Sequence, residues 1–311
     1  GIVGLLATGG STNHTIHLIA IARAAGIIIN WDDMSKLSEV VPLITRMYPN
    51  GAADVNHFHA AGGMPFVIYS LLSEELLHED VTTIVGHGLH HYTQESKINN
   101  KALEFQEGSK ESLNKNVIRS VTEPFSSHGG IKMLKGNLGR SVIKTAAVDE
   151  KQMIVEAPAV VFSEQKDLIK AFNNNELNKD FIAVVPFQGP KQNGMPELHN
   201  LTPSLTILQK RGFKVALVTD GRMSGASGKV PAAIHITPEA KDGGIISKIR
   251  TGDLIRLDAN KGELNIVDID LVMKRNPDNM NAQSGKTLGR NLFENARNIV
   301  SSSEEGASFI L

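Results

Sequence analysis

The apolar pattern of this 311-residue chain changes once, near residues 120–130, and that change limits the folds open to it. Before it, apolar residues recur at helical spacing, whereas beyond it they form short β-branched runs. Many short strands with a few interleaved helices favour a barrel-like β domain with helices packed on it. We therefore expect a mixed α+β and α/β chain, with a mostly helical domain at 1–125 and a β-barrel-like domain at 126–311.

Three helices are expected in the first part, each preceded by a residue that suits a helix start. The candidate first residues or caps are Ser11, Thr12 or Asn13, then Asp32 or Asp33, and finally Pro65. Gly26 is placed to end the first helix, and the second should end before Pro42. The polar stretch 99–116 is expected to be exposed.

Six runs in the second part have the apolar, β-branched character of strands. They are 142–147, 159–162, 182–187, 215–218, 254–257 and 264–267. Residues 258–262 suit a hairpin connection between the last two runs, because Asp, Asn and Gly favour tight turns. Helices are expected at 166–172, with Ser163 or Glu164 near the start, and at 203–211.

Composition narrows the class of protein. A net charge of −1 gives no electrostatic basis for binding nucleic acid or an anionic membrane surface. No apolar run reaches the ~18 residues that span a bilayer, and no signal peptide is visible. The chain has no cysteine, which excludes a disulfide framework within it. These features fit a cytoplasmic enzyme.

The strand expected at 215–218 runs into a turn rich in glycine and hydroxyl side chains. The turn reads Thr219-Asp220-Gly221-Arg222-Met223-Ser224-Gly225-Ala226-Ser227-Gly228. Glycines let the backbone bend sharply and let a ligand approach it closely. A serine on such a turn can face a substrate. An ordinary strand end would explain a few of these residues but not the whole run.

Residues 216–227 resemble a motif of the dihydroxy-acid and sugar-acid dehydratase family. Further segments are similar to the 6-phosphogluconate branch of that family: Tyr48-Pro49-Asn50-Gly51, Asn56-His57-Phe58, 60–65, His128-Gly129-Gly130, Gly136-Asn137-Leu138-Gly139-Arg140 and 188–199. The resemblance extends from Gly9 to the C-terminus. Family members are about twice as long, so it implies a C-terminal half whose last domain is a β-barrel.

The resemblance also implies an activity and its cofactors. The intact enzyme would dehydrate 6-phospho-D-gluconate to 2-dehydro-3-deoxy-6-phospho-D-gluconate, a step of the Entner–Doudoroff route. Family members use Mg²⁺ and an iron–sulfur cluster, 4Fe–4S or 2Fe–2S, and form homodimers. Because such clusters need cysteine thiolates, the cluster ligands would lie outside this chain, and the chain alone would be inactive.

Two side chains are expected to have central roles. By resemblance, Ser224 is the base that removes the C2 proton of the substrate, with Ser227 as the competing hydroxyl. A serine is too weakly basic unless nearby positive centres favour its alkoxide. By resemblance, Glu197 ligates magnesium, an ion that takes oxygen ligands. The alternative for Glu197 is a capping role at the following helix.

Other polar residues are candidates for binding the phosphorylated sugar acid. The substrate-binding candidates are Ser11, Asn13, His14, Arg222, Ser227, Asn137, Arg140 and Lys191, with His128 and Lys144 as further phosphate contacts. Backbone N–H groups at 9–13 would lie at a helix N-terminus, which favours anions. An arginine on a turn, such as Arg222, is as often a structural residue.

Two rival functions remain open. The chain could belong to another dehydratase of the same family, whose pocket does not bind a substrate phosphate. It could instead be a non-catalytic binding module that holds a transition metal through the histidines at 57, 59, 87, 90 and 91. No cysteine or dense acidic cluster accompanies these histidines, so ordinary polar histidines explain them better. Trp31, the only tryptophan, is expected in the core or at an interface rather than as a stacking platform.

Overall fold

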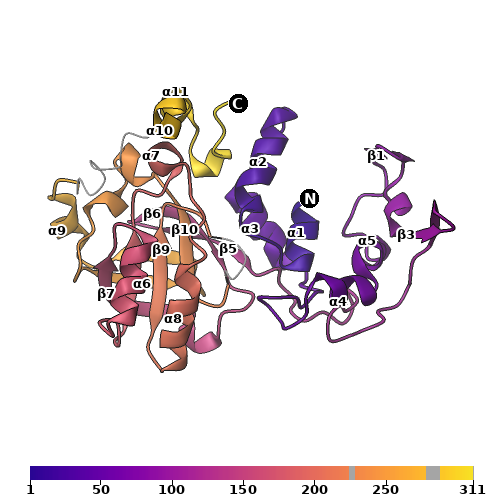
Figure 1. Cartoon of the computed structure of the whole chain (residues 1–311), viewed down its shortest axis with the longest axis horizontal. Helices are drawn as coiled ribbons and strands as arrows, with labels where there is room; N and C mark the ends of the chain where they lie inside the picture. Colours follow the sequence, from indigo (N-terminus) through magenta and orange to yellow (C-terminus); the bar gives the residue numbers. More distant parts are fainter. Residues whose placement is uncertain (224–227, 278–287, 311) are drawn as a thin grey trace. The chain divides into compact units, whose positions relative to one another are not determined.

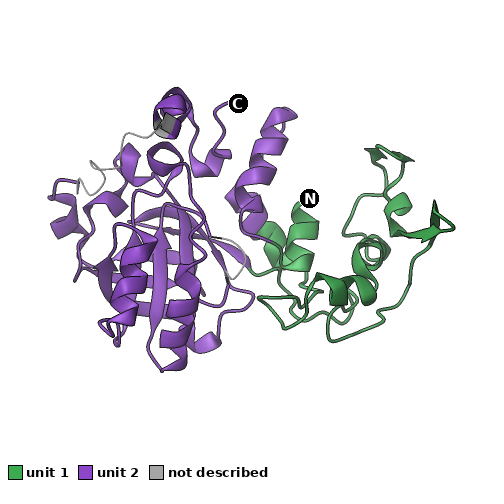
Figure 2. Cartoon of the chain, in the orientation of Figure 1, with its two compact units in different colours: residues 1–10, 36–130 green, residues 11–35, 131–311 purple. Residues whose placement is uncertain are grey.

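The computed structural model describes residues 1–223, 228–277 and 288–310 (Figure 1). The chain divides into two compact units, residues 1–10 with 36–130 as unit 1 and residues 11–35 with 131–311 as unit 2 (Figure 2). Residues 11–35 thus belong with the C-terminal part. The division into domains at 125/126 stays a prediction.

Unit 1 consists of short helices and two small hairpins. Its elements are α1 (Ile2–Thr8), the second half of α3 (Trp31–Val40), α4 (Val55–Ala60), α5 (Gly63–Ser73), η1 (Leu89–Thr93), β1 (Thr82–Thr83), β2 (Gly86–His87), β3 (Gln94–Asn99) and β4 (Ala102–Glu107). Strand β4 is exposed along its whole length, in line with the polar stretch expected at 99–116.

Unit 2 is built on a closed barrel of eight strands. They are β5 (Ile131–Gly136), β6 (Gly139–Lys144), β7 (Ile154–Val161), β8 (Phe181–Val185), β9 (Val215–Thr219), β10 (Ala232–Thr237), β11 (Leu254–Asp258) and β12 (Glu263–Ile266). Their order around the barrel is β10-β6-β5-β12-β11-β7-β8-β9. The expected mixed fold with a barrel and packed helices is confirmed.

Helices and turns surround this barrel in the described part of unit 2. They are α2 (His14–Ala24), the start of α3, α6 (Gln165–Asn173), α7 (Pro190–Asn193), α8 (Leu201–Lys210), α9 (Ile269–Met273), α10 (Leu288–Leu292), α11 (Glu294–Ile299), η2 (Glu150–Gln152), η3 (Ala240–Asp242), η4 (Ile245–Lys248) and η5 (Ser303–Glu305).

The barrel has two kinds of strand pairing. Strands β7, β8, β9 and β10 are parallel neighbours, which we call the parallel half. Strands β5, β6, β11 and β12 form two antiparallel hairpins, which we call the hairpin half. Parallel strands need long crossover connections, and these connections carry α6, α7 and α8. The loops that follow the parallel strands are therefore long enough to build a site.

Strand β8 shows why the parallel half is stable. Ile182 and Val184 belong to one apolar cluster with residues of the other barrel strands, and Phe181 belongs to a second cluster with α6 and α8. Side chains alternate along a strand, so one set fills the barrel and the other lies under the helices. Leu168 of α6 and Leu205 of α8 cover that outer face, as Figure 1 shows for both helices.

Most expected elements are present, but two barrel strands were not predicted. The six expected runs match β6, β7, β8, β9, β11 and β12, and the hairpin at 258–262 joins β11 to β12. Strand β5 was missed because two glycines precede it and its side chains alternate in character. Strand β10 was missed because alanine and histidine are weak strand signals.

Two expected helix starts are corrected. Asn30, not Asp32 or Asp33, caps α3: its side chain accepts the N–H of Asp33, and the Asp33 carboxylate accepts the N–H of Asn30, each at 3.0 Å. Helix α5 begins at Gly63, so Pro65 is its third residue. Proline is tolerated there because the first N–H groups of a helix have no partner within it.

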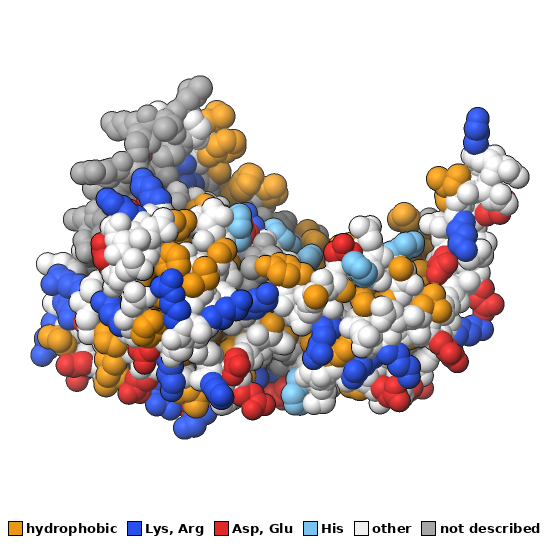
Figure 3. Space-filling view, turned by 60° about the horizontal axis from the view of Figure 1, so that its bottom comes forward, with side chains coloured by type: hydrophobic (Ala, Val, Ile, Leu, Met, Phe, Trp, Pro, Cys, Tyr) orange, Lys and Arg blue, Asp and Glu red, His pale blue; other side chains and the backbone are white. Residues whose placement is uncertain are grey.

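The helices and the surface charges bear on which environments the chain suits. In the described ranges, no helix combines the length and apolar character of a membrane span. Figure 3 shows basic and acidic side chains interspersed over the face in view. This distribution fits the net charge of −1.

Candidate active site

A polar network lies past the carboxyl ends of three parallel strands in unit 2. Asp220 follows β9, Gln188 follows β8 and Ala240 follows β10. The Asp220 carboxylate accepts the N–H of Gln188 at 2.8 Å, of Ala240 at 2.9 Å and of Phe187 at 3.2 Å. Loops at this end of parallel strands commonly form binding sites. The buried Asp220 side chain therefore joins the loops that follow β8, β9 and β10.

Asp220 is fully buried, which makes it a structural rather than a substrate-facing carboxylate. Burial raises the pKa of Asp220 to about 6, because a charge is poorly solvated there, although its backbone N–H donors oppose the shift. A buried carboxylate that bonds to backbone groups in this way orders the loops that follow β8, β9 and β10.

Glu239 extends this network toward α7. Its carboxylate accepts the N–H of Lys191 at 2.8 Å and that of Gln192 at 3.4 Å. Burial raises the pKa of Glu239 to about 7, and the nearby charge of Asp220 adds to the rise. A Cβ on Gly189 would lie 2.0 Å from Oε2 of Glu239, so only glycine allows this approach.

Glu197 and Arg222 form the partly exposed edge of the site. Arg222 donates from Nη1 to Oε2 of Glu197 at 3.1 Å and from Nε to the carbonyl of Met195 at 2.6 Å. The two residues also form a parallel β-bridge. Asn13 donates from Nδ2 to the same Oε2 at 3.4 Å. The structure thus brings together three predicted site residues, Asn13, Glu197 and Arg222.

The segment before α2 is joined to the start of the glycine-rich turn. The hydroxyl of Thr12 donates to the carbonyl of Met223. Asn13 occupies the N-cap position of α2, yet its side chain makes no capping bond and contacts Glu197 instead. Ser11 accepts the N–H of Asn13 at 3.2 Å, and Nδ1 of His14 lies 3.1 Å from the Ser11 carbonyl.

Oxygen ligands at this position fit magnesium in part. The buried Oδ1 of Asn13 has no hydrogen-bond partner among the described residues, and it lies on the same side chain that contacts Glu197. Carboxylate and amide oxygens are ligands that Mg²⁺ accepts. No group of three or more His, Cys, Asp or Glu residues in the described part could hold a metal by itself.

The alternative of a transition-metal site at the histidines gains no support from that result. In unit 1, His57 contacts the Asp54 carboxylate at 2.7 Å and caps α4 with it. His90 bonds to Glu79, and Nε2 of His87 lies 3.4 Å from Asp80. These are ordinary polar pairs at an exposed surface.

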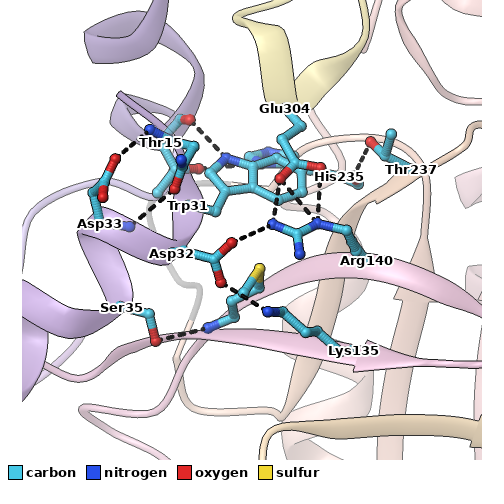
Figure 4. Close-up of polar contacts among 12 residues, drawn as sticks. Thr15, Trp31, Asp32, Asp33, Ser35, Lys135, Arg140, His235, Thr237 and Glu304 are labelled. Carbon is cyan, nitrogen blue, oxygen red and sulfur yellow. Dashed lines mark hydrogen bonds and ion pairs between the residues drawn. The ribbon is translucent and has the colours of Figure 1, made fainter. Parts of the chain in front are cut away.

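His235 is a buried polar residue that sequence reasoning missed. It lies on β10 and is fully buried, and its backbone N–H donates to the carbonyl of Gly221 at 2.9 Å. Its Nδ1 lies 3.2 Å from the Thr15 hydroxyl of α2, while Nε2 has no partner among the described residues. Trp31 donates to the Thr15 carbonyl at 3.0 Å and packs near the imidazole (Figure 4). Burial lowers the pKa of His235 to about 3.

Lys144 is another buried ionisable group, and it lies close to Gly228. It is 4% exposed at the end of β6, and burial lowers its pKa to about 8. A Cβ on Gly228 would lie 3.3 Å from its side chain, so the lysine stem packs against the end of the turn. A phosphate contact by Lys144 stays a prediction.

Three predicted substrate contacts are held by other protein groups. Arg140 bonds to Asp32 at 2.9 Å and to Glu304 (Figure 4), and Lys191 bonds to Asp242 at 2.7 Å. The amide of Asn137 bonds to the N–H and carbonyl of Ile266 at 2.7 and 2.8 Å. The further candidate His128, in unit 1, lies 3.3 Å from the Glu39 carbonyl.

The predicted base lies outside the described residues. Ser224 and its competitor Ser227 both fall in 224–227. The described residues on either side are Met223, which is bonded to Thr12, and Gly228, which packs on Lys144. The roles of the two serines stay predictions.

The fold and this site define a class of protein that sequence comparison identifies. A family model described as "Dihydroxy-acid/6-phosphogluconate dehydratase C-terminal" matches residues 116–307, and one described as "Dihydroxy-acid/6-phosphogluconate dehydratase N-terminal" matches residues 1–92. The chain belongs to the dihydroxy-acid/6-phosphogluconate dehydratase family.

Individual relatives sharpen the comparison within the family. Over 100% of the present chain, the sequence is 56% identical to phosphogluconate dehydratase of Escherichia coli K12. Over 98% of the present chain, it is 54% identical to phosphogluconate dehydratase of Pseudomonas aeruginosa. It is 36% identical to dihydroxy-acid dehydratase of Sulfurisphaera tokodaii over 98% of its length. It spans 52%, 50% and 52% of these relatives, about half of each.

Proposed function

We propose that the full-length protein is a hydro-lyase that dehydrates 6-phospho-D-gluconate to 2-dehydro-3-deoxy-6-phospho-D-gluconate. The observation that carries this proposal is the cluster of Glu197, Arg222 and Asn13 in a chain that matches phosphogluconate dehydratases over its whole length. The lower identity to a dihydroxy-acid dehydratase favours the phosphorylated substrate over a branched-chain acid.

In this proposal the chain's residues divide the work of binding and proton transfer. Removing a proton next to a carboxylate requires that the developing negative charge be stabilised. Glu197 and Asn13 would hold a magnesium ion, which would supply that stabilisation when bound to the substrate carboxylate. Arg222 orients Glu197. Ser224 would take the proton at C2 while the C3–O bond breaks, so that the C3 hydroxyl leaves as water.

An iron–sulfur cluster does not fit the residues of this chain, because the sequence has no cysteine whose thiolate could ligate iron. We propose that the cluster ligands, if the full-length protein holds a cluster, lie in a part of the protein outside these residues. Homodimer formation and a cytoplasmic location also stay predictions.

The test compares substrates and serine variants in the full-length protein. We expect dehydration of 6-phosphogluconate to be much faster than dehydration of gluconate. Ser224→Ala should abolish most turnover while keeping the fold, whereas Ser227→Ala should lose much less. Equal rates on the two substrates would point to another sugar-acid dehydratase, and the reverse order of the serine variants would move the base to Ser227.

A further inference from the structure

A cavity of about 460 Å³ lies in unit 2 beside the Glu197–Arg222 pair. Its size falls within the range of roughly 300–1,000 Å³ typical of small-molecule sites. The wall is formed by α2, the segment after α7, Arg222, helix α11 and the chain end after η5. The lining residues that matter here are His17, Met195, Arg222, Phe293, Arg297 and Phe309.

The charged side chains that line this cavity in the described ranges all have one sign. Arg222 and Arg297 contribute guanidinium groups, His17 adds an imidazole, and no acidic residue is among them. Within the same ranges, Arg297 makes no ion pair and neither ring nitrogen of His17 has a hydrogen-bond partner. Burial lowers the pKa of His17, and the neighbouring His14 and Arg222 lower it further. Arg297 therefore supplies a positive charge that no described carboxylate compensates, whereas Arg222 is paired with Glu197.

Apolar walls strengthen the attraction of such a site for an anion. Met195, Phe293, Phe309 and Val300 line the same cavity. They reduce the local dielectric constant, so that each charge–charge contact is worth more than in water. Arginine is the side chain best suited to a phosphate, because its planar fork donates two parallel hydrogen bonds.

Arg222 connects this cavity with the proposed metal-binding edge. It lines the cavity while its Nη1 donates to Glu197 at 3.1 Å. A substrate whose carboxylate lies at Glu197 would run past Arg222, and its opposite end would enter the cavity. We infer that this cavity is the subsite for the terminal phosphate of the substrate, with Arg297 and His17 as specificity-determining residues; the inference rests on the proposed function.

Two of the other predicted phosphate contacts, Arg140 and Lys191, are less suitable. Arg140 is bound by two carboxylates, and Lys191 by Asp242. Either residue would have to give up an ion pair before it could bind a phosphate, whereas Arg297 would not. The assignment therefore replaces the contacts expected from the sequence by residues that no motif pointed to.

The experiment uses the full-length protein and Arg297→Met, with Arg211→Met as the matched control. Arg211 follows α8 and bonds to Asn178 at 2.8 Å, away from the cavity. The first measurement is the calorimetric affinity for inorganic phosphate, and the second is kcat and KM on 6-phosphogluconate and gluconate. His17→Gln and Arg297→Lys complete the set.

Loss of one charge-assisted hydrogen bond predicts about a ten- to hundredfold weaker affinity for phosphate in Arg297→Met. KM for 6-phosphogluconate should rise by a similar factor with kcat little changed, and kinetics on gluconate should be unaffected. Arg297→Lys should recover part of the affinity, His17→Gln should lose less than Arg297→Met, and Arg211→Met should match the parent.

Two outcomes would overturn the inference. An unchanged phosphate affinity in Arg297→Met would place the phosphate elsewhere, even if the enzyme dehydrates 6-phosphogluconate as proposed. An equal loss on both substrates would show a general structural role. If instead phosphate binding depends on Arg297 but 6-phosphogluconate is not dehydrated, the subsite stands and the proposed function fails.

Discussion

The parallel half and the hairpin half of the barrel use polar side chains differently. Past β8, β9 and β10, the carboxylates of Asp220 and Glu239 bond to loop backbone and leave Glu197 and Arg222 at an accessible edge. In the hairpin half, polar side chains close the structure on itself. Asn137, for example, joins the β5–β6 turn to β12 with both ends of its amide.

The difference follows from strand connectivity. An antiparallel hairpin needs only a tight turn, so its polar residues satisfy that turn and the neighbouring strand. A parallel strand must be followed by a long crossover, whose loops need internal support and remain open to a ligand. We therefore expect ligand-binding residues mainly past the parallel half, with the hairpin half as a scaffold.

The largest effect that tests this comparison is on turnover. Glu197→Gln in the full-length protein should lower kcat about 10²–10³-fold, because a neutral amide replaces the proposed magnesium-binding carboxylate. The fold should survive, since the amide keeps an acceptor for Arg222. The measurement is kcat on 6-phosphogluconate together with a thermal unfolding curve.

Glu156 provides a matched control for this variant. It is paired with Arg256 at 3.1 Å, the same distance as the Glu197–Arg222 pair, but that pair joins β7 to β11. Glu156→Gln should leave kcat within about twofold, because an exposed ion pair contributes little. Equal losses in the two variants would remove the proposed distinction.

The second effect concerns the pH dependence of stability. The pKa of His235 in the folded protein is about 3, below its ordinary value of 6.5, so folding favours the neutral imidazole. Its contribution to stability is complete above pH 6.5 and is lost as the pH falls toward 3. Between pH 6.5 and 4.5 the loss should be about 2 kcal/mol, because the unfolded imidazole is already half protonated at pH 6.5 and the slope reaches ~1.4 kcal/mol per pH unit only below that.

His235→Asn isolates this contribution. Asparagine tolerates the positive φ of 60° found at this position and can still bond to Thr15, but it does not titrate. Urea unfolding at both pH values should show a smaller loss of stability in the variant. Identical losses in the two proteins would mean that His235 is accessible to protons in the folded state.

Much of the fold could be predicted from the sequence, because apolar periodicity is a local signal. The hairpin at 258–262 and the strand leading into Asp220 were both predicted. Strand β10 was not, because its residues 232–237 include two alanines and His235, which carry little strand propensity. Its position is set by parallel pairing with β9, a contact that local sequence does not show.

The site was only partly predictable for a similar reason. Asn13, Glu197 and Arg222 were singled out through motifs, and they lie together. Arg140 was predicted to bind substrate because the sequence alone does not show its ion pair with Glu304, which is 164 residues away in the chain. Arg297 belongs to no motif, and only the cavity that it lines makes it a candidate.

The third effect is a loss of stability without a loss of activity. Asn137→Ala removes two hydrogen bonds to Ile266 in the hairpin half. We expect the free energy of unfolding to fall by about 2 kcal/mol, because a backbone N–H and a carbonyl lose their partners. Denaturant unfolding measures the loss, and kcat/KM on 6-phosphogluconate checks the activity. A rise in KM specific to the phosphorylated substrate would instead return Asn137 to the substrate site.

The smallest effect is expected at Lys191. Its backbone supports a loop of the parallel half, while its side chain forms an ion pair on the protein surface. Its backbone N–H holds Glu239, a role that any residue except proline can fill, whereas its ammonium group pairs with Asp242. Lys191→Gln should therefore change stability by less than about 1 kcal/mol.

Affinity for the substrate separates this structural role of Lys191 from the predicted phosphate contact. If the ammonium group serves only the ion pair, KM for 6-phosphogluconate stays within about twofold in Lys191→Gln, and Asp242→Asn gives the same result. If the ammonium group leaves Asp242 to bind phosphate, Lys191→Gln raises KM while Asp242→Asn lowers it, because the released lysine is then free for the substrate. Changes of KM in opposite directions in these two variants would show that the substrate-binding surface of the parallel half includes α7.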